Sequence, residues 1–275
     1  MIEELWNSEE VKKLQENYIK YLVTEERLDG EDIDKDRCSY AWKNLYKEHY
    51  ENREFWKKTC FNYNNVENKR KYEIFFGESS CRISGDLLFN FKSEKDGAKG
   101  KGKKYEHYES LIKNESDFDE EKKDLYLEIL EFCNQMNYTL HNFGLMSVDG
   151  NLQIFKENVC NMDRVDMFIY WIDSYFTRKD DKLFSRIMST YRDEEQRKND
   201  KNEKKKTLEL FLAKFQNVYN YCKEMYLISE DFVERLLDSG KEEIKCGKDV
   251  VRYMELAIEY WILKDKILNE EIIIE

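Results

Sequence analysis

Apolar side chains recur at helical spacing in six separate segments, and this periodicity is what most limits the fold of the chain. Within each segment, apolar residues lie three or four positions apart and so share one face of a helix. The alternation of strands and helices that marks a parallel sheet is missing, which makes a dinucleotide-binding type of sheet improbable. The pattern predicts a mainly α-helical fold. The six segments are 11–22, 38–56, 125–140, 165–176, 208–222 and 250–268.

Local signals predict some helix ends and a few strands. Asn7 or Ser8 can cap the first helix, because a short polar side chain accepts hydrogen bonds from free backbone N–H groups. A shorter helix is expected from about Glu230 to Ser239, ended by Gly240 at the position after the helix that glycine favours. Three short apolar runs could pair as a small sheet or lie in buried coil. These runs are Tyr72–Phe76, Leu87–Phe91 and Leu152–Phe155.

The expected organisation is a single globular domain over residues 1–275. It comprises N-terminal helices in 1–60 and a helical core in 61–275, with room for a small inserted β-hairpin. Segments 93–104 and 193–206 are polar and lack periodicity, so they are expected to be mobile surface loops.

Charge and composition restrict the classes of partner and compartment. The chain has 58 acidic residues against 46 Lys and Arg, a formal charge of −12, so direct contact with a nucleic-acid backbone is disfavoured. The longest apolar run, Met167 to Ile172, is too short to cross a membrane, and the acidic N-terminus lacks the features of a signal peptide. Seven scattered cysteines without C-x-x-C spacing suit reduced thiols. A cytoplasmic protein is therefore expected.

Motifs that carry chemistry are few. Gly97 to Lys104 departs by one residue from a phosphate-binding loop, because Lys104 replaces the hydroxyl that would hold Mg²⁺. We interpret this stretch as a flexible basic loop. The three histidines, His49, His107 and His141, lack the spacing of a zinc-binding helix. No catalytic residues, metal site or cofactor are predicted, and a non-enzymatic role is favoured over an enzymatic one.

Residues 138–166 form the most unusual stretch, because a long irregular connection inside a compact domain is uncommon and often functional. Asn142, Lys156, Asp163 and Arg164 are the candidate binding residues in this connection, and Asp86, in a second tight polar turn, is expected to face them. Lys156 and Arg164 would contact an anion, whereas Asp163 suits the N-terminus of the next helix. The alternative interpretation is a buried structural connection without a ligand.

Several short motifs resemble a family of uncharacterised helical proteins, a domain of unknown function found in low-GC bacteria, their phages and other mobile elements. The resemblance covers roughly residues 60–268 and implies a helical fold without adding an activity. This chain departs from the family in having Ser147 or a neighbour in a segment that usually holds proline, and His141 where glycine is common. The residues that carry the resemblance are Gly85-Asp86, Asn90-Phe91, Asn142-Phe143, Met146, Gly150-Asn151-Leu152, Lys156, Asp163-Arg164, Asp166, Phe168, Tyr253-Met254, Ala257 and Trp261.

Three functions are compatible with the sequence. The first is an acidic, non-enzymatic module that binds another protein through a basic surface. The absence of proline and the scarcity of alanine indicate an AT-rich bacterial or phage genome, so this module could act in phage defence or counter-defence, for example as an inhibitor of a nucleic-acid-binding host protein. The second is an enzyme or sensor for a nucleotide or small anion, with a pocket around Asn142, Lys156 and Arg164. The third is a structural or antitoxin-like subunit, which would expose a large apolar patch. The oligomeric state stays open.

Overall fold

The computed structural model describes about two thirds of the chain, and every structural statement below concerns that part. The predicted helix at 38–56 and the polar loops at 93–104 and 193–206 lie largely outside it. The described residues are 1–18, 50, 53–58, 61–62, 72–76, 79–93, 104–137, 139–147, 152, 155–156, 160, 164–178, 182–189 and 205–269.

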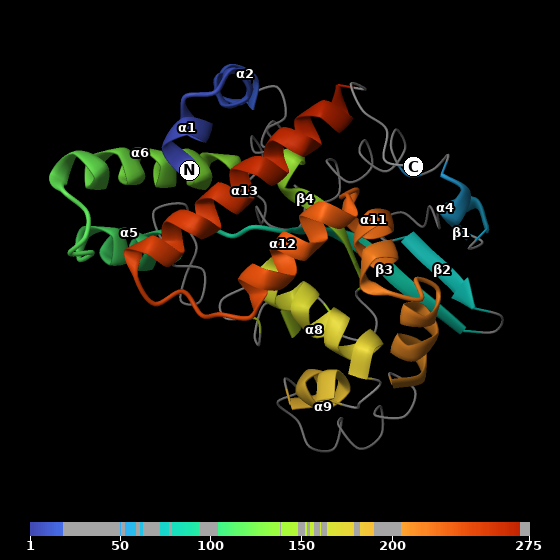
Figure 1. Ribbon diagram of the computed structural model, residues 1–275. Coiled ribbons are helices and arrows are strands. Elements are labelled where there is room, and N and C mark those ends of the chain that lie inside the picture. The colour runs from blue at the N-terminus through green and yellow to red at the C-terminus, as the bar shows by residue number, and fades with distance from the viewer. Residues whose placement is uncertain are drawn as a thin grey trace, which may run out of the picture.

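Most of the described chain is helical, which confirms the predicted mainly α fold (Figure 1). The Ser8 hydroxyl accepts from the backbone N–H of Val11 at 3.2 Å and so caps α2, as one of the two predicted N-caps. The helices are α1 (Ile2–Trp6), α2 (Glu9–Asn17), α4 (Glu54–Lys58), α5 (Lys104–Lys113), α6 (Glu120–Met136), the 3-10 turn η5 (Leu140–Asn142), α8 (Val165–Arg178), α9 (Lys182–Ser189), a helix at 205–213, α11 (Val218–Tyr226), α12 (Glu230–Gly240) and α13 (Gly247–Leu268).

The predicted hairpin is present and forms part of a larger antiparallel sheet. Its two strands, β2 (Tyr72–Phe76) and β3 (Ser79–Leu87), are flanked by β1 (Phe61–Asn62) and β4 (Phe143–Ser147) in the order β1-β2-β3-β4. In the β3–β4 ladder, Asp86 pairs with Gly144 and Leu87 with Phe143. The sheet thus joins the predicted hairpin to the unusual stretch around residue 142.

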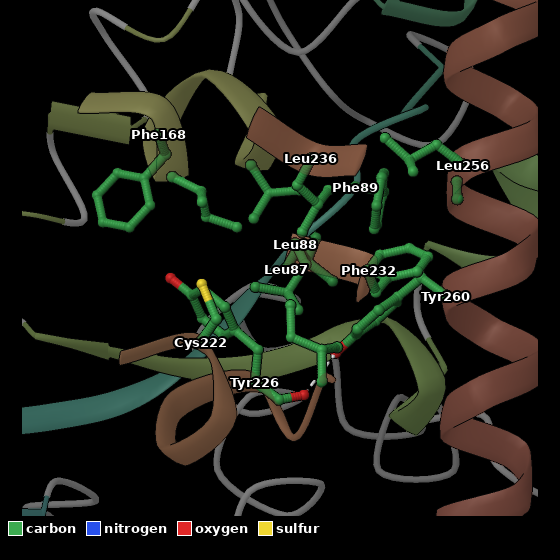
Figure 2. Close-up of a cluster of buried hydrophobic side chains, with 14 of the residues drawn as sticks. Leu87, Leu88, Phe89, Phe168, Cys222, Tyr226, Phe232, Leu236, Leu256 and Tyr260 are labelled. Carbon is green, nitrogen blue, oxygen red and sulfur yellow. Dashed lines mark hydrogen bonds between the residues drawn. The ribbon is translucent and has the colours of Figure 1, made fainter. Parts of the chain in front are cut away.

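The long helix α13 crosses the molecule and organises the core (Figure 1). It contacts α1, α2, α5, α6, η5 and α12, and the buried side chains of the described chain belong to one connected cluster. Figure 2 shows part of that cluster, where Leu88, Phe168, Leu236 and Tyr260 converge from four parts of the chain. Helical spacing of apolar residues explains this arrangement, because it places Val250, Met254 and Trp261 on one inward face of α13.

Of the other two apolar runs, 87–91 is mostly buried coil, which is one of its two expected states, whereas the described residues of 152–155 are helical, which neither expectation included. Only Leu87 of the run 87–91 belongs to a strand, and the chain then turns, with the N–H of Leu88 donating to the Asn142 carbonyl at 2.9 Å. Leu152 and Phe155 are helical. The residues 87–91, 152 and 155 are all buried, so the mainly apolar composition of these runs did not distinguish a strand from buried coil or helix.

Two predicted helix boundaries also need correction. The segment 208–222 is two helices, because Gln216 has a φ of 69° and the Asn217 side chain caps α11 by accepting from the Asn220 N–H at 2.8 Å. Gly240 is the last residue of α12 and has no left-handed backbone. Glycine is required there because an added Cβ would lie 2.3 Å from the Asp166 carbonyl oxygen. The ends of the two predicted loops are helical as well, at Lys104 and at 205–206.

Candidate functional site

Asp86 and Lys156 form an ion pair at the end of β3. The Lys156 ammonium lies 3.2 Å from Asp86 Oδ2 and donates to the Leu87 carbonyl at 2.7 Å. Lys156 is fully buried, whereas 16% of the Asp86 side chain is exposed. The structure therefore brings these two predicted site residues together. Lys156 holds the strand end through a backbone contact as well as through its charge.

Asn142 is fully buried and binds the segment that follows β3. Its Oδ1 accepts from the Phe89 N–H at 3.0 Å and from the Trp261 indole N–H at 3.1 Å. Its Nδ2 donates to the carbonyls of Phe89, at 2.7 Å, and Asn137, at 3.3 Å. An asparagine amide has two donor hydrogens and an acceptor oxygen with two lone pairs, so these four bonds use its whole capacity. The geometry gives Asn142 a structural role.

Arg164 lies at a different place, the junction between α8 and α12. Its guanidinium forms a two-point ion pair with Asp166 and donates to the carbonyls of Ser239, at 3.0 Å, and Glu242, at 2.7 Å. Asp163 is outside the described residues. The structure thus groups Asp86, Asn142 and Lys156 near the end of β3, and places Arg164 with other partners.

A pocket of about 370 Å³ adjoins Arg164. Three arginines line it, Arg164, Arg235 and Arg252, together with five carboxylates, and the pocket contains neither Asn142 nor Lys156. Arg235 pairs with Glu259, and Arg252 lies 3.5 Å from Asp249. The excess of carboxylates disfavours an anion at this place, so the nucleotide or anion pocket stays a prediction without geometric support.

Sequence reasoning missed two buried basic groups. Lys264 in α13 is fully buried, and burial, together with the nearby Arg53, lowers its pKa to about 7. His141 is also fully buried, and burial lowers the pKa of its imidazole below the usual value despite the neighbouring Asp265. Lys264 lies on the apolar face of a predicted helix. The only sequence signal for a buried amine was therefore this lysine among the apolar residues of that face.

The outer face of α6 holds a row of carboxylates, which we call the α6 acidic stripe. It comprises Glu121, Asp124, Glu128 and Glu131, all exposed. At 3.6 residues per turn these positions fall within a sector of roughly 80° and extend over about 15 Å. No ion pair joins Glu121, Asp124 or Glu128 to any other described residue, whereas Glu109, Asp117 and Glu120 each pair with a lysine. Glu131 accepts a hydrogen bond from the Tyr105 hydroxyl, and the other three carboxylates of the stripe are available to a partner.

Other features bear on the predicted classes. Among the described residues, no group of three His, Cys, Asp or Glu side chains could hold a metal ion. No helix of the described chain combines the length and apolar character needed to cross a bilayer. Met1 is the only large hydrophobic side chain that is strongly exposed in the described part.

Comparisons with known proteins add no family or function. Neither the protein-family models, nor the curated proteins, nor the solved structures include a match to this chain.

Proposed function

We propose that the protein is an acidic binding module that engages a basic surface of another protein through the α6 acidic stripe. The stripe is the observation that carries this proposal. Four exposed carboxylates face outward from a helix whose opposite face is anchored in the core by residues such as Ile129 and Cys133. A rigid helix presents its charges in a fixed arrangement, so a partner meets them at little entropic cost.

The charge of the described chain is concentrated around this helix. Residues 104–137 hold ten acidic residues against four lysines. In Figure 1, α5 and α6 lie side by side at one edge of the molecule, away from the sheet. A surface that gathers negative charge attracts a basic partner from a distance and accelerates their association. Segregated charge thus favours a protein-binding role more than the net charge alone does.

The target class that fits best is a host protein whose basic surface otherwise holds nucleic acid. Side chains spaced three or four residues apart on a helix lie about 5–6 Å from one another, so the stripe offers a line of closely spaced negative charges. Lysines and arginines that contact a phosphate backbone could pair with such a line. Inhibition of that host protein, in phage defence or counter-defence, is the role we propose.

Affinity capture with matched variants tests the proposal. The stripe variant carries Glu121→Gln, Asp124→Asn, Glu128→Gln and Glu131→Gln, and the control variant neutralises four exposed carboxylates elsewhere. The same protein should be captured from a low-GC bacterial lysate by wild type and control, and lost with the stripe variant and at high salt. Equal capture by the stripe variant would overturn the proposal. The control substitutions are Glu10→Gln, Glu16→Gln, Glu209→Gln and Glu230→Gln.

A further inference from the structure

We draw no further inference here: the strongest candidate, the buried amine of Lys264 at the junction of α11 and α13, rests on its lowered pKa alone, and nothing in the described part of the structure shows a ligand or a moving element beside it.

Discussion

Arg164 and Asp166 form a two-point ion pair at the contact between the start of α8 and the end of α12. The Arg164 guanidinium also donates to two carbonyls at the C-terminal end of α12, where the helix dipole favours a cation. Asp166 in turn accepts from the Ser239 hydroxyl at 2.6 Å and from the Met167 N–H at 2.9 Å. Both charged side chains are almost fully buried. The pair holds α8 and α12 together where they cross. These contacts give Arg164 a structural role.

Breaking this buried pair should destabilise the protein strongly. We expect Arg164→Met to lower the free energy of unfolding by roughly 3–5 kcal/mol, because it leaves the Asp166 carboxylate buried without its cation. The double variant Arg164→Met with Asp166→Leu should lose less than the sum of the two single losses. Urea unfolding followed by circular dichroism measures all three values. Additive losses would show that the two residues do not act as a pair.

The same crossing should not tolerate a methyl group at Gly240. An alanine Cβ would lie 2.3 Å from the Asp166 carbonyl oxygen and 2.6 Å from its carbon, and backbone atoms cannot move aside as a side-chain end can. Gly240→Ala should therefore destabilise the fold by about 1–3 kcal/mol or more. Lys241→Ala, one residue later and exposed, is the matched control and should stay within about 0.5 kcal/mol of wild type. If Gly240→Ala left the free energy of unfolding unchanged, α8 and α12 would have to lie further apart than the structure shows.

Lys264 should make stability depend on pH above neutrality. Burial lowers its pKa from 10.5 to about 7, so between these values the unfolded chain binds more protons than the folded chain does. Stability therefore rises as the pH rises through this window, by roughly 2 kcal/mol from pH 7 to pH 9. Thermal and urea unfolding at both pH values should show this rise in wild type.

Lys264→Met is the complementary variant. It removes the buried amine and keeps a long apolar side chain, so it should be more stable than wild type at pH 7 and should lack much of the rise toward pH 9. A Lys264→Met protein that keeps the full pH dependence would show that Lys264 does not cause it.

Helices with one apolar face could be predicted well from the sequence. Ser8, the apolar face of α13 and the segment 125–136 lie in regular patterns that depend on few neighbours. Fully buried segments were harder, because Phe143–Ser147 is buried on both faces and shows no alternation of apolar and polar residues. The break at Gln216 was missed because helical spacing of apolar residues continues across it.

The candidate site residues were chosen by residue type and by their place in an irregular segment. That reasoning correctly joined Asp86 to Lys156, since polar residues between buried runs need partners. It did not separate Arg164 from that pair, because its contacts come from Ser239 and Glu242, more than 70 residues away. Long-range contacts of this kind leave no local pattern.

The most direct test of the central claim is the affinity of the captured partner as a function of salt, measured by interferometry for wild type, stripe variant and control variant. Four exposed ion pairs of about 0.5 kcal/mol each predict that the stripe variant binds at least about tenfold more weakly than the control. The wild-type affinity should also fall steeply with added salt. An affinity that is insensitive to salt, or equal for the stripe and control variants, would contradict binding through the α6 acidic stripe.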